Sequence, residues 1–157
     1  MADLDPRLTP ARPDLAARFL EGSVTAERFV DGTPARLIDG LAPLRRAPRP
    51  DAGLDTEVLH GERLTVYDED DEGWAWVQLA RDGYVGWIPA AAYLKGEGPR
   101  PTHKVAALRT FLYPGPSIKL PPLGWASFGA RVVVVRETEA NGRRFAVTGD
   151  GRAIVAN

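Results

Sequence analysis

The chain has 157 residues, of which 44% are hydrophobic and 26% charged, and its net charge is −1. This composition is typical of a globular protein with one domain or two small ones. The two signs of charge are interspersed, so the sequence offers no basic patch for nucleic acid or an anionic membrane.

The sequence also excludes several kinds of segment and site. No apolar run approaches the roughly 20 residues that a transmembrane helix needs. The polar, proline-rich N-terminus lacks the basic and apolar regions of a secretion signal, which predicts a cytoplasmic protein. The chain has no cysteine, and disulfides, thiolate metal sites and thiol nucleophiles are therefore absent from it.

Residues 1–33 are expected to form a lead-in that contains a short helix. In "RPDLAARFLEG", Pro13 occupies a plausible first helical position and Gly22 lies just past the end. Leu15 and Phe19 are four residues apart and would share one helical face. Two turns of helix are marginal in isolation, so this segment must pack on a larger body.

Residues 34–96 have the pattern of a small β domain. Alternating apolar residues in "GERLTVYDE" are followed by the acidic turn "DEDDEG", the strand "WAWVQLA", the turn "RDG" and the strand "YVGWIP". Four or five short strands within about 55 residues, separated by glycine-rich or charged turns, favour a small barrel or sandwich.

The strand pattern recurs 68 residues later. "HGERLTVYDE" matches "FGARVVVVRE", "EGWAWVQ" pairs with "NGRRFAV", and "DGYVGWIP" pairs with "DGRAIVAN". The Gly/Pro-rich segment "KGEGPRPTH" lies between the two copies and reads as a linker. We therefore predict a second barrel over residues 101–157.

The sequence contains no recognisable catalytic or metal-binding set. Residues 68–72, "DEDDE", lack the ligand spacing of a calcium loop and fit a solvated hairpin turn. His60 and His103 are the only histidines and lie in unrelated contexts, which supports neither a zinc site nor a catalytic pair. Ser127 lacks the spacing of a nucleophile elbow. We expect no cofactor and no metal.

The aromatic residues allow two interpretations. Trp74 and Trp76 are two apart and point to one sheet face, so one of them is expected to pack outside the barrel, against the lead-in or the second barrel. Trp87 fits barrel core, and Tyr84 combines an apolar ring with a polar tip that needs a partner. Alternatively, Trp87 and Trp74 form an aromatic wall of a ligand site.

The order of these elements resembles a known family. "LDTEVLHGERLTVYDEDDEGWAWVQLARDGYVGWIPAAAYL" resembles the first bacterial SH3 domain of NlpC/P60 cysteine peptidases, the γ-D-glutamyl-L-diamino-acid endopeptidase or dipeptidyl-peptidase VI branch. "THKVAALRTFLYPGPSIKLPPLGWASFGARVVVV" resembles their second SH3 domain, and "DPRLTPARPDLAARFLEG" their N-terminal lead. The fold class expected is thus mainly β, with two SH3-like barrels in tandem and a short helical lead-in.

The resemblance implies a role for particular residues. In that family the first SH3 domain helps to bind the free α-amine at the L-Ala end of a peptidoglycan stem peptide, through a tyrosine and an acidic residue. Tyr84 matches the tyrosine, and the acid corresponds to Asp55 or Glu57. A carboxylate and a phenol oxygen can both accept charge-assisted hydrogen bonds from an ammonium.

Two functions follow from these observations. The first is a non-catalytic recognition module of a cell-wall peptide hydrolase, with muropeptides and an NlpC/P60 catalytic domain, fused or in trans, as partners. The family's cysteine nucleophile is absent from this chain, so the chain as given is not expected to be an enzyme. The alternative is a free-standing SH3-like adaptor that binds peptides through Tyr67, Trp74 and the acidic turn.

Overall fold

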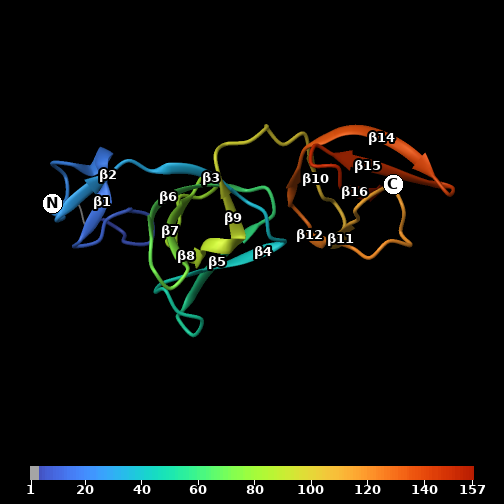
Figure 1. The fold of residues 1–157 in the computed structure, drawn as a ribbon. Helices are drawn as coiled ribbons and strands as arrows, with labels where there is room; N and C mark the ends of the chain where they lie inside the picture. Colours follow the sequence, from blue (N-terminus) through green and yellow to red (C-terminus); the bar gives the residue numbers. More distant parts are fainter. Residues whose placement is uncertain (1–3) are drawn as a thin grey trace. The chain divides into compact units, whose positions relative to one another are not determined.

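The computed structural model describes residues 4–157, which consist almost entirely of short strands and connecting turns (Figure 1). The chain divides into two compact units. Within the described residues, unit 1 comprises residues 4–37, 42–58 and 62–97, and unit 2 comprises Ile38–Leu41, Leu59–Gly61 and Gly98–Asn157. The mainly β fold class is confirmed, whereas the domain boundaries at 33, 96 and 101 stay predictions.

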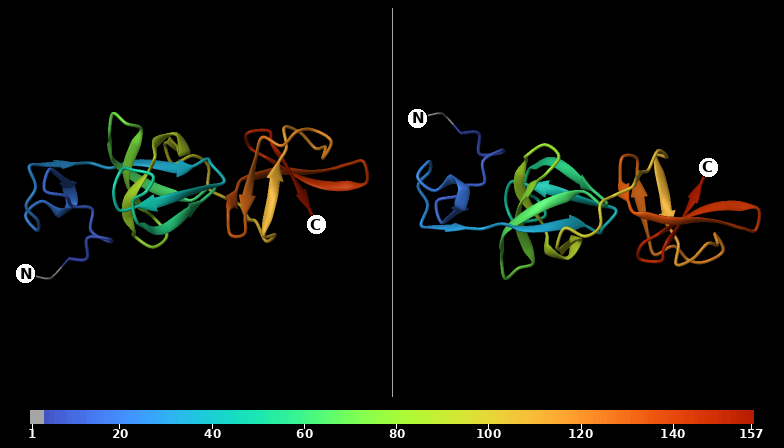
Figure 2. Two further views of the ribbon diagram at one scale, coloured as in Figure 1. Left: turned by 90° about the horizontal axis from the view of Figure 1, so that it is seen from below. Right: turned by 90° about the horizontal axis from the view of Figure 1, so that it is seen from above.

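Unit 1 is built on one curled sheet of seven strands. Their order is β5 (Leu54–Leu59), β4 (Leu41–Arg45), β8 (Val85–Pro89), β7 (Trp74–Leu79), β6 (Arg63–Glu69), β3 (Thr33–Leu37) and β9 (Tyr93–Lys95). The short 3-10 turn η2 (Ala90–Ala92) joins β8 to β9. Figure 2 shows that the sheet bends around its own interior, as expected for a small barrel.

Alternation along the strands decides which side chains enter that interior. In β7, the side chains of Ala75, Val77 and Leu79 are buried in the main core of unit 1, together with Ile88 from β8. Successive side chains of a strand point to opposite faces, so Trp76 lies on the outer face. Its cross-strand partner there is Trp87 of β8.

The lead-in differs from the expected two-turn helix. It forms the strand β1 (Leu15–Ala17), a single 3-10 turn η1 (Arg18–Leu20) and the strand β2 (Arg28–Val30), and β1 pairs in parallel with β2. All three residues of β1 are buried, while Phe19 is 69% exposed. Burial of three consecutive side chains, without an apolar stripe from Leu15 to Phe19, suits an extended segment better than a helix.

The lead-in covers the outer face of the barrel within unit 1. Leu15, Trp76 and Val85 form a second buried cluster, and Val30, Tyr67 and Trp87 pack against it. Trp76 is only 4% exposed in this position. The expectation that one of the two neighbouring tryptophans packs outside the barrel, against the N-terminal segment, is confirmed for Trp76.

Arg12 fastens the lead-in to this outer face. Its guanidinium carbon lies 4.5 Å from the ring centre of Trp76 and 5.0 Å from that of Trp87. The same group pairs with Asp14 at 2.7 Å and with Asp68 of β6 at 2.6 Å. Burial alone would lower the pKa of Arg12, but the hydrogen bonds to the two carboxylates outweigh burial and hold the pKa above its ordinary value.

We expect Arg12→Gln to loosen the lead-in without unfolding the sheet. The change removes two ion pairs and two cation–π contacts, which together stabilise the segment by about 1–2 kcal/mol. Hydrogen exchange should therefore quicken about 5- to 30-fold at the Ala17 amide, which donates to the Pro10 carbonyl at 2.9 Å. Arg18→Gln removes only exposed contacts, with Asp31, Glu21 and the Phe29 carbonyl, and is the control; equal acceleration in both variants would contradict this role of Arg12.

Unit 2 contains the remaining strands. The strand β10 (His103–Lys104) pairs with β13 (Arg131–Val132), and β11 (Arg109–Leu112) pairs with β12 (Gly124–Ser127). A three-stranded sheet consists of β14 (Val134–Ala140), β15 (Arg143–Thr148) and β16 (Ala153–Ala156). The core of unit 2 contains buried aliphatic residues from four of these strands and from their connections: Val105, Leu112, Ala126, Ala130, Val132 and Ile154.

Two further features concern function classes. Neither helical turn in residues 4–157 is long or apolar enough to cross a bilayer. The same residues include no cluster of three or more His, Asp or Glu side chains that could hold a metal ion.

Candidate functional site

Tyr84 stands at the start of β8, between two glycines that each have a backbone role. Gly83 has a φ of +78°, a backbone conformation that residues other than glycine rarely adopt, and it closes the turn between β7 and β8. A Cβ on Gly86 would lie 2.7 Å from the Arg45 carbonyl oxygen of β4. Gly83 therefore allows the turn, and Gly86 allows the close approach of β4. Together they fix the backbone on both sides of Tyr84.

The backbone around Tyr84 is also hydrogen-bonded on both sides. Its amide donates to Oδ1 of Asp82 at 3.1 Å, and its carbonyl accepts from the Leu79 amide at 2.9 Å. The Tyr84 ring is half-buried against the main core of unit 1. A phenol packed in this way has its ring fixed by apolar neighbours, which leaves the hydroxyl as its one polar contact group.

The two candidate acids lie on one face of β5, but their surroundings differ. The Asp55 side chain is only 6% exposed; its Oδ1 accepts from Nε of Arg46 at 2.8 Å and lies 2.8 Å from Nη2. Both nitrogens face Oδ1, and Oδ2 has no hydrogen-bond donor among residues 4–157. Glu57 is exposed, and its backbone carbonyl accepts from Nη2 of Arg81 at 3.5 Å.

Arg7 of the lead-in is bonded to the backbone beside Tyr84. Its carbonyl accepts from the Val85 amide at 2.7 Å, directly after Tyr84. The pKa of Arg7 lies above its ordinary value, chiefly because the guanidinium donates to Asp5; the charges of Tyr84 and Asp55 act in the same direction. At this corner of unit 1 the lead-in therefore meets the beginning of β8.

The structure groups the predicted site residues differently from the sequence. Asp55 is paired with Arg46 and Tyr84 packs on the core of unit 1, whereas Glu57 is exposed. Trp87 follows Val85 on the outer face, opposite to Tyr84 and Ile88, and packs beside Arg12, so the expectation that it belongs to the barrel core is wrong. Trp74 is half-buried and shares that outer face with its cross-strand partner Pro89. The tryptophans and Tyr84 thus do not form one wall.

The acidic turn after β6 is engaged within unit 1. Asp70 accepts from the backbone amides of Glu72 and Trp74 at 3.0 and 2.8 Å, which closes the hairpin between β6 and β7. Glu69 binds the hydroxyl of Tyr93 and the ammonium of Lys95. The expectation of a hairpin turn here is confirmed.

Comparison with known proteins agrees with the fold of unit 1. Residues 44–92 match the family described as the bacterial dipeptidyl-peptidase SH3 domain. This region is similar to a bacterial SH3 domain. The match includes Tyr84 and Asp55, together with Trp74 and Trp87, and it leaves the predicted second SH3 barrel untested.

Solved structures give a second comparison. The chain is similar to a crystal structure of an NlpC/P60 family protein from Bacillus cereus ATCC 10987, with a TM-score of 0.58 and 19% identity over 80% of this chain and 54% of that one. NlpC2 and NlpC1 from Trichomonas vaginalis match at a TM-score of 0.36 each, with 13% and 12% identity over 83% and 97% of this chain and 48% of each of theirs. A search of curated proteins finds no match.

The similarity to the Bacillus cereus protein shows a shared fold. The chain spans about half the length of the solved structures that it matches. The sequence signals for the site were Tyr84 and the pair Asp55 and Glu57. Arg46 and Arg7 had no signal, because only the folded sheet brings them to Asp55 and Tyr84.

Proposed function

We propose that this chain is a substrate-recognition module of a cell-wall peptide hydrolase, and that its SH3-like domain holds the free amino terminus of a peptidoglycan stem peptide. The observation that carries the proposal is the corner where the lead-in meets β8: the Asp55 carboxylate is held there by Arg46 at 2.8 Å, and the Tyr84 ring is held by the core of unit 1. Tyr84, Asp55 and Arg46 belong to the region similar to the bacterial dipeptidyl-peptidase SH3 domain.

The chemistry of the corner suits an ammonium. The Asp55 carboxylate is held in place by Arg46 through Oδ1, which leaves Oδ2 to accept from a ligand. A hydrogen bond from an ammonium to a carboxylate is charge-assisted and stronger than a neutral one. An acylated nitrogen carries no charge and fewer protons, so such a site would select peptides with a free amino terminus over intact peptidoglycan.

The proposed role is recognition and not bond cleavage. Hydrolysis by the cysteine-peptidase route needs a thiolate and a general base, and this chain has no cysteine. The module would therefore act with a Cys/His catalytic domain, either fused to it or supplied in trans. Its contribution to such an enzyme would be to position the amino end of the peptide.

The structure of unit 1 gives less support to the adaptor alternative. The Tyr67 ring packs 6.0 Å from that of Trp76 instead of lining an open groove. Asp68 is paired with Arg12, and Glu69 with Lys95, at 2.6 and 3.0 Å. A basic or proline-rich peptide would have to displace these internal partners.

The two acids provide the test of the proposal. Asp55→Asn should weaken binding of a free-amine L-Ala-γ-D-Glu-diamino-acid peptide about 10-fold, because a charge-assisted hydrogen bond is lost. Glu57→Gln removes the same charge from the same strand face and should change binding less than 2-fold. Isothermal titration calorimetry of the folded chain measures both affinities. If the chain alone binds too weakly to measure, the titration uses the chain joined to a catalytic domain.

The N-acetylated peptide distinguishes recognition of the amine from a general loss of charge. It should bind weakly, and equally to the parent chain and to Asp55→Asn. The assignment of Asp55 to the amine would be refuted if Glu57→Gln lost more affinity than Asp55→Asn. It would also be refuted if Asp55→Asn lost equal affinity for the free and the acetylated peptide.

A further inference from the structure

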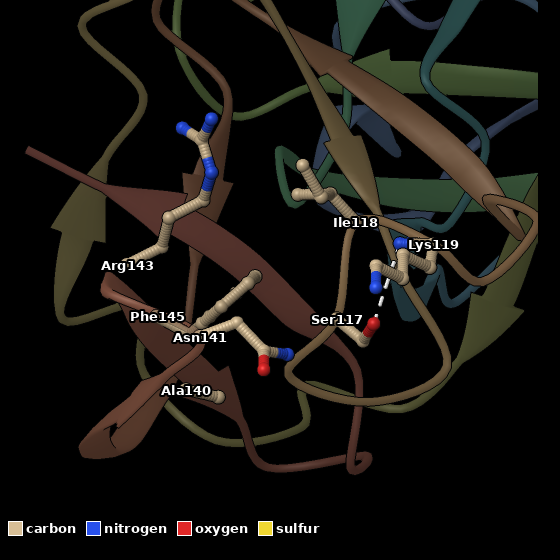
Figure 3. A pocket seen from close by; sticks show the side chains of 7 residues that line it. All are labelled: Ser117, Ile118, Lys119, Ala140, Asn141, Arg143 and Phe145. Atoms are coloured by element: carbon tan, nitrogen blue, oxygen red, sulfur yellow. Dashed lines mark hydrogen bonds between the residues drawn. The ribbon is translucent and has the colours of Figure 1, made fainter.

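Unit 2 contains a pocket that the proposal for unit 1 does not use. Its volume is about 140 Å³, and it lies between the segment that contains Ser117, Ile118 and Lys119 and the turn of the β14–β15 hairpin (Figure 3). Pockets that enclose whole drug-sized ligands measure roughly 300–1,000 Å³. This one therefore has room for a single end group of a larger molecule.

The strand register gives the pocket an apolar floor. Phe145 of β15 pairs with Thr138 of β14, and Arg143 pairs with Ala140. These side chains share one face of the hairpin, and Phe145, Arg143 and Ala140 all line the pocket. Phe145 is 1% exposed, so its ring forms a fixed base.

The same register separates the charges of the hairpin. Glu139 pairs with Arg144, and Glu137 pairs with Ala146, on the face away from Phe145. Arg144 is neutralised there by Glu137 at 3.0 Å. The pocket is lined by two cationic residues, Lys119 and Arg143, and by no carboxylate.

Neither cation of the pocket has an acidic partner within residues 4–157. Among the basic side chains of unit 2, Arg144 pairs with Glu137 and Arg152 pairs with Asp150 at 2.5 Å, whereas Lys104, Arg109, Arg131 and Arg136 form no ion pair within residues 4–157. Lys119 and Arg143 belong to no such pair. Two unneutralised cations from different segments, both lining one hollow, create a local preference for an anion.

Two polar side chains add hydrogen-bonding capacity. Figure 3 shows the Asn141 side chain extending toward Ser117 across the hollow. The Ser117 hydroxyl oxygen accepts from the Lys119 amide at 3.3 Å, which leaves its proton free to donate to a ligand. Asn141 has a φ of 51° and is followed by Gly142 at 71°, as in the tight hairpin turns favoured by Asn-Gly, so its position is set by the backbone.

We propose that this pocket binds the terminal carboxylate of a peptide whose last residue is small and apolar. Lys119 and Arg143 would neutralise the carboxylate, Asn141 and Ser117 would donate to its oxygens, and the last side chain would lie on Phe145. The apolar floor distinguishes this ligand from inorganic phosphate, which has no apolar part to bury. The proposal concerns unit 2 and is independent of the amine site in unit 1.

An NMR titration of the ¹⁵N-labelled full chain tests the proposal. The probes are acetyl-Ala-Ala with a free carboxylate, the same peptide as its carboxamide, and inorganic phosphate. The acid should shift the amides of Ser117, Lys119, Asn141 and Gly142 in a saturable way, while the carboxamide should bind at least 10-fold more weakly because its end is uncharged. Absence of saturable shifts with the acid, or equal binding of the carboxamide, would overturn the proposal.

A charge-matched control separates the pocket from the overall charge of the hairpin. Lys119→Gln and Arg143→Gln should each weaken binding of the acid about 3- to 10-fold, which allows for partial solvent screening. Arg144→Gln removes the same charge one residue away, on the opposite face, and should leave binding unchanged. An equal loss in Arg144→Gln, or equal shifts of the pocket amides by phosphate at the same concentration, would leave only a general attraction for anions and refute a carboxylate site.

Discussion

Replacing Ile88 with alanine is expected to lower the free energy of unfolding of unit 1 by about 2–5 kcal/mol. Ile88 is fully buried at the centre of the curled sheet, on β8 between β4 and β7. Removing its outer carbons leaves a void among Val77, Leu44 and other core side chains that the strands cannot close. Denaturant unfolding followed by tryptophan fluorescence reports on this unit, because three of the four tryptophans lie in it.

The control for this experiment is Leu94→Ala on β9. Leu94 is 49% exposed, so the same kind of truncation should cost less than about 1 kcal/mol. If both variants unfold at the same denaturant concentration, Ile88 does not occupy the packed core of a curled sheet, and the barrel assignment for unit 1 is wrong.

Much of unit 1 could be predicted from the sequence because its strands alternate. Ala75, Val77 and Leu79 are spaced two apart and enter the core, and the acidic and Asp-Gly turns lie where the hairpins reverse. Period-two patterns specify a local backbone and one buried face at once. This is why the mainly β fold could be derived without knowledge of the sheet order.

The lead-in shows where such local rules fail. Proline, acidic and glycine positions around Leu15 favoured a helix, yet this segment is extended and pairs with β2. The contacts of this segment with Trp76 and the interactions of Arg12 are tertiary. They stabilise the extended form more than the marginal free energy of a two-turn helix would stabilise a helix. No pattern near Arg12 in the sequence pointed to Asp68, which lies 56 residues away.

The candidate sites show the same limit. In the sequence, Tyr84 is distinguished by its flanking glycines. In the structure those glycines have backbone roles, and the Tyr84 ring packs on the core. The choice between Asp55 and Glu57 required the fold, since the structure pairs Asp55 with Arg46 and leaves Glu57 exposed. In unit 2, the pairing of Arg143 with Ala140 and of Arg144 with Glu139 decides which cation faces the pocket. A sequence gives the order of such charged residues, but it does not show on which face of the hairpin each side chain lies.

The functional prediction with the largest expected effect concerns the Tyr84 hydroxyl. Tyr84→Phe should leave unit 1 folded, because the ring that packs against the core is retained. If the hydroxyl oxygen accepts from the ammonium of a stem peptide, its loss should weaken binding by about 1.5–3 kcal/mol, or roughly 10- to 100-fold. Titration calorimetry with the free-amine peptide measures the loss, and near-UV circular dichroism checks that the fold is unchanged.

The acetylated peptide and a double variant make this prediction specific. Acetylated peptide should bind equally to the parent chain and to Tyr84→Phe, because it has no ammonium to hold. Since Tyr84 and Asp55 are proposed to hold the same group, the losses in Tyr84→Phe/Asp55→Asn should differ from the sum of the single losses by about 0.5 kcal/mol or more. Strictly additive losses would mean that the two residues act on different groups, and an unchanged affinity in Tyr84→Phe would leave Tyr84 with only its packing role in the barrel.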